Sequence, residues 1–283
     1  MSYITTSDQQ QLYYKDWGKG PLVVLIHGWP LSSDSWDDIA MNLANHGFRC
    51  ISYDRRGFGR SSQPWDGYEY NRLADDLADV LAFAGAEDAT LVGFSMGGGE
   101  VARYLSRHQG KHINRVVLIS SILPFRLLTH DNPSGTAAEH FTKTAQAIRQ
   151  DRAHFLQRFF KDFFGMSMLS QPVSNELLEW MRSIALQAGS RGTLCCLDAF
   201  SGTDFRDELS AFTMPTLIIH GTEDQTVPIG ASAHLTAAAI PHAVLLEYQG
   251  APHGLFATHR DRVVQDLLHF LEPLHKTNTS ERL

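Results

Sequence analysis

Short, continuous apolar segments alternate along this chain with segments of helical periodicity, and that alternation constrains the fold most. The apolar segments are rich in Val, Ile and Leu, and they lack the two-residue alternation of a half-buried strand. Such segments are typical of strands covered on both faces of a parallel sheet. The strands predicted in this way are Leu22–Ile26, Phe48–Tyr53, Thr90–Phe94, Val116–Ile119, Thr216–Ile219 and Val244–Tyr248.

Amphipathic segments lie between these strands. In the segment 71–84, for example, Leu73, Leu77 and Leu81 fall on one stripe, which is the spacing of a helix that packs on one face. Helices are predicted at 33–45, 71–84, 96–108 and 261–271. The stretches Tyr3–Thr6 and Leu12–Trp17 predict an edge hairpin. Together these segments predict an α/β protein with a mostly parallel, doubly wound sheet.

One region interrupts the alternation of strands and helices. From about Pro124 to Phe212 the pattern is helical, rich in phenylalanine, and without a convincing strand. Proline follows Leu123 and Met214, and proline disfavours continuation of regular structure at both ends. We therefore predict an α/β core formed by residues 1–123 and 213–283. Residues 124–212 are predicted to form a helical cap inserted into that core, within a single structural domain.

The composition limits the classes of molecule that the protein is expected to bind. Hydrophobic residues make up 43% and charged residues 19% of the 283 residues, as in ordinary globular proteins. Lys plus Arg total 24 against 31 Asp plus Glu, a net charge of -7, and no Lys/Arg run is present. This balance argues against a nucleic-acid-binding surface. The 14 histidines form no tract typical of a zinc site, so no metal is predicted.

The cysteines and the apolar segments indicate the compartment. Cys50, Cys195 and Cys196 form no disulfide framework, which favours free thiols in a reducing environment. The first residues lack the basic and apolar regions of a secretory signal. No apolar run approaches the length of about 18 residues that spans a membrane. We therefore expect a cytoplasmic protein.

The segment Gly93-Phe94-Ser95-Met96-Gly97 is a G-x-S-x-G motif between a predicted strand and a predicted helix. In that context the motif forms a sharp turn that presents the serine hydroxyl above the sheet edge. Its glycines allow two backbones to approach closely. The pattern G-x-G-x-x-G is absent here, so dinucleotide binding is not predicted. Ser95 is the candidate nucleophile.

A serine nucleophile needs a general base, and the base needs an acidic residue to orient it. Asp224 follows the predicted strand 216–219, at a strand end where such sheets place functional loops. Glu223 is the adjacent competitor, and Asp224 is favoured. His253 follows the predicted strand 244–248, in a loop between Pro252 and Gly254. The order Ser, Asp, His along the chain is the one that a G-x-S-x-G nucleophile requires.

Two other histidines also follow predicted strands. His27 and His220 each precede a glycine, which favours hydrogen bonding to the loop backbone over a catalytic role. His253 is the predicted base because its chain order and its loop position agree. An oxyanion hole needs two N–H donors, one of them from the residue after the nucleophile, here Met96. The other should come from the loop 27–30, and Trp29 is its predicted donor because Pro30 has no N–H.

With these residues assembled, the chain resembles the α/β-hydrolase superfamily from Tyr3 to about Leu274, and within it the cofactor-free haloperoxidase, perhydrolase and aryl esterase group. The resemblance rests on the ordered segments HGWPLSSDSW, YDRRGFGRSSQPWDGY, LVGFSMGGGEVARY, FSGTDFR and APHGLFATH. It implies the α/β-hydrolase fold, with the helical insertion as the cap and with no cofactor. It also implies the triad of Ser95, Asp224 and His253. Trp29 and Met96 would be the oxyanion donors.

The resemblance further implies a substrate pocket. The residues that it assigns to the pocket are Pro30, Phe125, Phe159, Phe163, Phe200 and Ile229. Pro30 matches members that form peracids. Phe159 and Phe163 fit the core of the cap equally well. Ile229 differs in size from the residue typical of its position, so the resemblance leaves the size of the pocket open.

The expected function is hydrolysis of small alkyl or aryl carboxylic esters through an acyl-enzyme on Ser95. With hydrogen peroxide in place of water, the same acyl-enzyme would give a peracid, which oxidises bromide or chloride away from the enzyme. The alternatives are lactone or carbon–carbon bond hydrolysis on the same triad, and a non-catalytic ligand-binding protein of this fold. The expected partners are small ester, peroxide and carboxylic acid substrates, without nucleic acid or membrane. The resemblance also implies a homo-oligomer, often a trimer.

Overall fold

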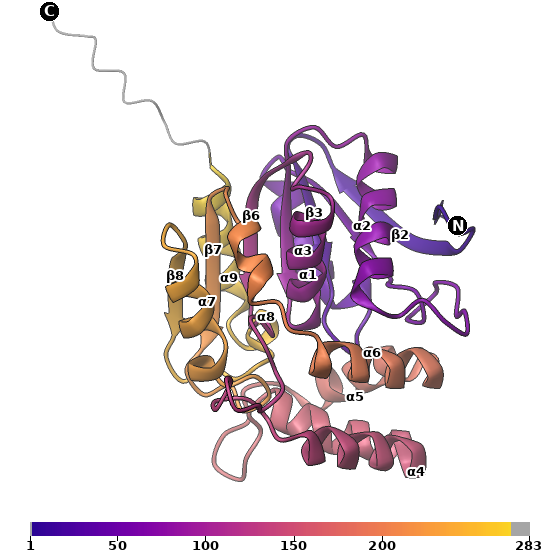
Figure 1. Cartoon of the computed structure of the whole chain (residues 1–283), viewed down its shortest axis with the longest axis vertical. Helices are drawn as coiled ribbons and strands as arrows, with labels where there is room; N and C mark the ends of the chain where they lie inside the picture. Colours follow the sequence, from indigo (N-terminus) through magenta and orange to yellow (C-terminus); the bar gives the residue numbers. More distant parts are fainter. Residues whose placement is uncertain (1, 273–283) are drawn as a thin grey trace, which may run out of the picture.

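A computed structural model of the chain describes residues 2–272; residue 1 and residues 273–283, which belong to the predicted core ranges, lie outside the described residues. The strands form one sheet in the order β1-β2-β4-β3-β5-β6-β7-β8 (Figure 1). Their bounds are β1 Tyr3–Thr5, β2 Gln11–Gly18, β3 Leu22–Ile26, β4 Arg49–Tyr53, β5 Ala89–Phe94, β6 Ile113–Ile119, β7 Thr216–Gly221 and β8 Val244–Tyr248. The pairs β1–β2 and β2–β4 are antiparallel, and every pair from β4–β3 to β7–β8 is parallel. The predicted hairpin and the mostly parallel sheet are confirmed.

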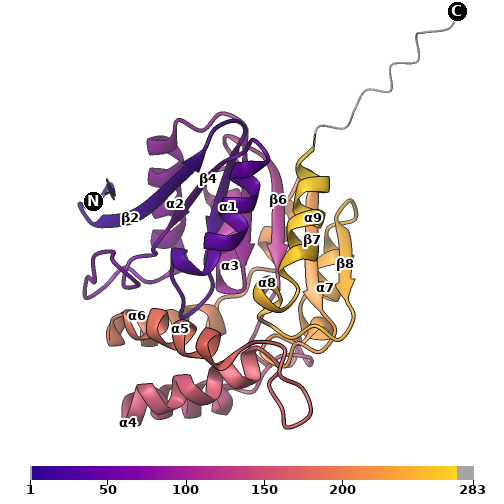
Figure 2. The ribbon, with the colours of Figure 1, turned by 180° about the vertical axis from the view of Figure 1, so that it is seen from behind.

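Helices cover both faces of the sheet, which explains why the strand sequences are continuously apolar. Along β3, Val24 and Ile26 belong to one buried cluster, whereas Val23 and Leu25 belong to the other. The first cluster includes residues of α2, α3 and α7, and the second includes residues of α1, α8 and α9 (Figures 1 and 2). These helices are α1 Asp37–Asn45, α2 Tyr70–Ala84, α3 Met96–Arg107, α7 Ala233–Ala239, α8 Leu255–Thr258 and α9 Arg260–Leu271. The segment predicted as one helix at 33–45 is divided into a short 3-10 turn, η1 (Ser33–Trp36), and α1.

The insertion between β6 and β7 contributes the remaining helices. They are α4 Ala138–Phe163, α5 Asn175–Leu186, α6 Ser190–Gly202 and the 3-10 turn η2 Asp207–Ala211. In both views α4, α5 and α6 lie together at one end of the sheet (Figures 1 and 2). The backbone of α4 is interrupted at Asp151, where φ is -157° and ψ is 90°. Within residues 2–272, no helix is long and apolar enough to cross a membrane.

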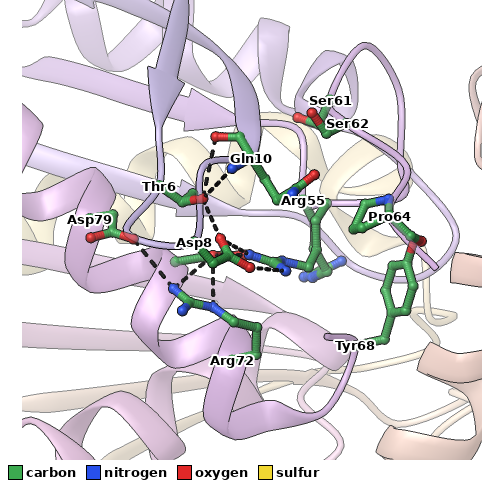
Figure 3. A network of polar contacts seen from close by, with 12 residues as sticks. Thr6, Asp8, Gln10, Arg55, Ser61, Ser62, Pro64, Tyr68, Arg72 and Asp79 are labelled. Carbon is green, nitrogen blue, oxygen red and sulfur yellow. Dashed lines mark hydrogen bonds and ion pairs between the residues drawn. The ribbon is translucent and has the colours of Figure 1, made fainter. Parts of the chain in front are cut away.

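A polar network ties the edge hairpin to the loop after β4 and to α2 (Figure 3). Asp8, in the turn between β1 and β2, accepts two hydrogen bonds of 2.9 Å from the guanidinium of Arg56. The same guanidinium donates to Asp76 of α2, which is also paired with Arg72 one helical turn earlier. Arg72 and Ser7 both contact Asp79 on the next turn. β1 has only three residues with which to pair with β2, so this network adds contacts that hold the edge hairpin on the protein.

Candidate active site

Ser95 is the single residue between β5 and α3, and its backbone has φ 53° and ψ -116°. A residue with a side chain rarely adopts positive φ, and such strain is typical of functional sites. A Cβ on Gly93 would lie 2.8 Å from the carbonyl oxygen of Gly97, and one on Gly97 would lie 2.6 Å from that of Ile26. Only glycine fits at these two positions. The tight turn therefore holds the Ser95 side chain at the carboxyl end of β5, where 6% of the residue is exposed.

A chain of hydrogen bonds joins Ser95 to His253 and Asp224. The distance from Ser95 Oγ to His253 Nε2 is 3.0 Å, and that from His253 Nδ1 to Asp224 Oδ2 is 2.6 Å. A carboxylate only accepts hydrogen bonds, so His253 Nδ1 carries the proton and its Nε2 lone pair faces the serine hydroxyl. This is the arrangement in which a histidine takes a proton from serine.

The loop after β7 holds Asp224 in place. Backbone N–H groups of Thr226 and Val227 donate to Asp224 Oδ1 over 2.9 Å and 2.7 Å. Burial alone raises the pKa of Asp224, but the charge of His253 and the hydrogen bonds from His220 and His253 outweigh it and lower the pKa below its ordinary value. Asp224 is therefore ionised at neutral pH. The adjacent Glu223 has an exposed side chain, and it is Asp224 that reaches His253.

Two backbone N–H groups lie beside the nucleophile without an acceptor. Met96 begins α3, where N–H groups have no partner inside the helix, and Trp29 belongs to the loop after β3. Within residues 2–272, neither N–H donates to any acceptor. Cβ of Ser95 lies 3.0 Å from the position that a Cβ on Gly28 would occupy, which places the loop that carries Trp29 against the serine. These two donors are available to an oxyanion formed at Ser95.

The other histidines at strand ends bond to loop backbone. His27 is fully buried, with Nδ1 2.9 Å from the carbonyl oxygen of Gly28 and with Nε2 accepting from the backbone N–H of Arg55. Burial and the charge of Arg55 hold the pKa of His27 well below its ordinary value, so the ring is neutral. His220 lies 2.8 Å from the carbonyl oxygen of Val227 and 3.2 Å from Asp224. It supports the loop that carries Asp224.

A cavity of about 740 Å³ opens onto Ser95 and His253. Loops of the core form one wall, and side chains of α4 and α6 form the other. Trp29 packs between them: its ring centroid lies 5.4 Å from that of Phe159 and 5.7 Å from that of Phe200. The predicted site residues that line this cavity are Ser95, His253, Trp29, Met96, Phe159 and Phe200.

Four of the predicted pocket residues lie outside the cavity lining. Pro30 is buried, and Ile229 lies half-buried in η3 (Ile229–Ala231). Phe163 is fully buried, and its ring packs on the ring of His253 with centroids 4.9 Å apart. Phe125 faces the Arg206 guanidinium, 5.2 Å from its ring centroid. Phe163 therefore packs against the ring of His253, whereas Phe125 packs outside the cavity lining.

Phe155 and Arg126 are among the residues that line the cavity without having been predicted as site residues. Phe155 lies one helical turn before Phe159, and the two rings stack with centroids 5.7 Å apart. Their i,i+4 spacing is the signal from which Phe155 could have been predicted once Phe159 was assigned to the pocket. Arg126 also lines the cavity, and no periodic pattern or motif marks it in the sequence. Among residues 2–272, no three His, Cys, Asp or Glu side chains gather in a group that could hold a metal ion.

Residues 21–260 match the family model of the alpha/beta hydrolase fold. The chain is 39% identical over 273 residues to a non-heme chloroperoxidase of Kitasatospora aureofaciens, covering 96% of this chain and 99% of that protein. It is 38% identical over 275 residues to a bifunctional esterase/perhydrolase of Acinetobacter calcoaceticus, with the same coverage. The crystal structure of a bromoperoxidase from Bacillus anthracis superposes with a TM-score of 0.93 at 43% identity, covering 96% of this chain and 99% of that one.

Proposed function

The chain belongs to the alpha/beta hydrolase fold family, and from that membership we propose that it hydrolyses small carboxylic esters through an acyl-enzyme on Ser95. The observation that carries the proposal is the hydrogen-bond chain from Ser95 through His253 to Asp224. A serine hydroxyl is a weak nucleophile alone, and an oriented base is what activates it.

Acylation follows from the positions of these side chains. Ser95 Oγ attacks the ester carbonyl carbon while its proton passes to His253 Nε2. The ionised Asp224 stabilises the imidazolium that forms. The Trp29 and Met96 N–H groups stabilise the oxyanion, and one such donor typically lowers the barrier by about 2.7–4 kcal/mol. When the carbonyl re-forms, the alkoxy group leaves with the proton from His253, and the acyl group stays on Ser95 Oγ.

Deacylation uses the same groups with a new nucleophile. Water gives its proton to His253 and attacks the acyl-enzyme, and Ser95 regains a proton as the carboxylic acid leaves. If hydrogen peroxide attacks instead, the product is a peracid. That peracid transfers its terminal oxygen, with its proton, to a halide ion, giving hypohalous acid and the carboxylate. The names of the relatives, an esterase/perhydrolase and haloperoxidases, support both outcomes.

We further propose that residues 124–212 act as a cap that covers the apolar part of the substrate in the cavity. The aromatic side chains of this segment that line the cavity are Phe141, Phe155, Phe159 and Phe200. Such a wall favours small apolar acyl or aryl parts, as is usual for ligand pockets.

The test of the proposed function is the variant Ser95→Ala. We expect hydrolysis of 4-nitrophenyl acetate to fall by at least about 10⁴-fold, because no other group replaces the nucleophile. Ser210→Ala, at an exposed position in η2, is the matched control, and circular dichroism checks the fold of both. Ester hydrolysis retained by Ser95→Ala would overturn the assignment. So would failure of a fluorophosphonate probe to label Ser95 in the wild-type protein.

The peracid route is tested in the same variant. Wild-type protein given acetate, hydrogen peroxide and bromide should brominate monochlorodimedone, and Ser95→Ala should not. Bromination that persists without Ser95 would mean that the halide is oxidised by another route. A panel of acetate, aryl and lactone esters, each with and without peroxide, separates ester hydrolysis from lactone hydrolysis on the same triad.

The assembly and the compartment are proposals as well. We propose a homo-oligomer, as the resemblance implies, and light scattering after size-exclusion chromatography gives its mass. We also propose a cytoplasmic location, because Cys50, Cys195 and Cys196 form no disulfide. Cell fractionation tests it.

A further inference from the structure

Arg126 is a buried arginine in the wall of the active-site cavity. It lies in the segment between β6 and α4, 7% of the residue is exposed, and it shares the cavity lining with Ser95 and His253. Its Nη2 donates a 2.8 Å hydrogen bond to the carbonyl oxygen of Thr226, two residues after Asp224. The guanidinium therefore lies beside the loop that carries the catalytic acid.

The hydrogen-bonding capacity of this guanidinium is largely unused. Within residues 2–272, no carboxylate forms an ion pair with Arg126, and its buried Nε has no acceptor. The two other buried arginines of the described chain are different: Arg55 pairs with Glu100, and Arg56 pairs with Asp8 and Asp76. Arg126 is thus a buried cation without a carboxylate partner among the residues that the structure describes.

The charge of Arg126 persists at neutral pH. Burial lowers the pKa of Arg126 to about 10, although the charge of Asp224 opposes that shift. Asp224 does not supply the missing acceptor, because its oxygens are taken by the N–H groups of Thr226 and Val227 and by His253. A buried charge without a hydrogen-bonded partner is costly, and buried charges are normally paired.

The acidic residues and the other arginine that line the cavity beside Arg126 are exposed to water. Arg158, Asp151 and Asp162 line the cavity, but all three are exposed, so water screens them. Arg126 differs from these residues because it is buried, so water screens its charge much less. An anion that enters the cavity would gain most from contact with this side chain, because a guanidinium matches the two oxygens of a carboxylate.

We propose that Arg126 is a specificity-determining residue that binds a carboxylate of the substrate, so that the preferred esters are small molecules carrying a second, ionised carboxylate. This inference rests on the proposed ester hydrolysis at Ser95. The second carboxylate belongs either to the acyl part, as in a half-ester of a short dicarboxylic acid, or to the alcohol part, as in an acylated hydroxy acid. In both cases it lies next to the loop of Asp224.

The experiment compares each acid with its amide, which has the same shape and no charge. Monoethyl glutarate and its monoamide test the acyl part, and O-acetylglycolate and O-acetylglycolamide test the alcohol part. In at least one pair, wild-type protein should favour the acid by about tenfold or more in kcat/KM, as a hydrogen-bonded ion pair provides. Arg126→Met, which keeps the length of the side chain, should remove that preference. Arg126→Lys should keep part of it, since it retains the charge but not the planar fork.

The ratio of acid to amide is the readout because support of Thr226 by Arg126 would affect both substrates alike. If Arg126→Met lowers both rates by the same factor, Arg126 is structural and the proposal is overturned. Arg158→Met is the matched control, since it removes a cavity charge at an exposed position. Loss of the preference in Arg158→Met, but not in Arg126→Met, would also overturn the proposal.

A binding measurement separates this inference from the proposed function. In a Ser95→Ala background, calorimetry should show that monoethyl glutarate or O-acetylglycolate binds at least about tenfold tighter than its amide, and that Arg126→Met removes the difference. If 4-nitrophenyl acetate is hydrolysed but neither acid is preferred in rate or in binding, only the inference on Arg126 fails. If Ser95 is not labelled and no ester is hydrolysed, the proposed function fails.

Discussion

Two adjacent carboxylates, Glu223 and Asp224, have opposite surroundings. The side chain of Glu223 is exposed, whereas Asp224 is 2% exposed and accepts hydrogen bonds from the backbone of Thr226 and Val227. Backbone donors and the neighbouring His253 favour the charged form of Asp224 although it is buried. Two residues that are adjacent in the loop thus differ: Glu223 is exposed to water, whereas Asp224 is buried and hydrogen-bonded to His253.

The variant Asp224→Asn tests that difference. An amide can donate to His253 Nδ1, which would move the ring proton to Nε2 and remove the base from Ser95. We expect kcat for 4-nitrophenyl acetate to fall by about 10⁴-fold, as for other triads of this kind. Glu223→Gln, the matched control, should retain wild-type kcat. Equal losses in the two variants would contradict the assignment of Asp224.

The hydrogen-bonded arrangement of Ser95, His253 and Asp224 could be predicted from the sequence because local rules mark each of the three residues. A strand, a G-x-S-x-G turn and a helix locate Ser95, and Asp224 and His253 follow later strands in the required order. Pocket residues follow no such rule. Phe125 and Phe159 are both aromatic residues of the insertion, but only Phe159 lines the cavity. The direction of each side chain depends on packing between distant segments.

At the scale of elements, the edge hairpin shows how side-chain contacts stabilise β1, a strand too short to be stable through its own pairing. β1 has three residues, and its turn is fixed by Asp8, which binds the buried guanidinium of Arg56 through both oxygens. The hydrogen bond from Arg56 holds the pKa of Asp8 well below its ordinary value. The charged form of Asp8 is therefore the form that stabilises the fold.

The pH dependence of stability should reveal this contribution. The folded-state pKa of Asp8 lies below its unfolded value of about 3.9, so its contribution is complete above that pH and is lost as the pH falls through the folded pKa. We expect Asp8→Asn to lower the free energy of unfolding by about 1 kcal/mol at pH 7, a modest value because the Asp8 side chain is 37% exposed. The difference from wild type should begin to shrink below about pH 4.

Urea unfolding at pH 7, 5 and 3 measures the effect. Asp88→Asn is the control, because Asp88 is exposed and has no ion pair within residues 2–272. A deficit in Asp8→Asn that stays constant from pH 7 to pH 3 would show that the charge of Asp8 does not contribute.

Long, periodic helices could be predicted, and very short helices could not. The six predicted strands and the helices α2, α3 and α9 occur within a few residues of their expected ends. α7 has seven residues and α8 has four, which is too short for a helical period to show. The continuous pattern at 33–45 hid the division into η1 and α1, because both parts place apolar side chains against the same face.

At the scale of the whole molecule, Trp29 joins the core to the insertion. Its backbone belongs to the loop after β3, whereas its indole Nε1 donates a 2.9 Å hydrogen bond to the carbonyl oxygen of Thr193 in α6. Its ring also packs against Phe155, Phe159 and Phe200 of the insertion. The helices of the insertion therefore hold the loop that carries Trp29, whose N–H we propose as an oxyanion donor.

The variant Trp29→Phe removes the hydrogen bond while keeping an aromatic ring. Thr193 is 1% exposed, so its carbonyl would lose a partner that water does not readily replace. We expect a loss of about 1–3 kcal/mol, which corresponds to a fall of roughly 2–10 °C in the thermal unfolding midpoint for a chain of this size. kcat should fall as well. Trp65→Phe, at a residue that is 71% exposed, should leave both values unchanged. A midpoint unchanged in Trp29→Phe would show that this bond does not couple the two parts.

The place of β8 in the sheet has a consequence for how the protein loses activity. Among the described strands β8 lies at the edge of the sheet and pairs with β7 alone, and His253 lies in the loop that follows it. Edge elements open locally at a lower free energy than the whole domain unfolds. Each such opening separates the base from a nucleophile carried by the central strand β5. The contact between His253 and Ser95 is therefore lost at the free energy of local opening at this edge. The free energy of unfolding of the central strands is only an upper limit for that value.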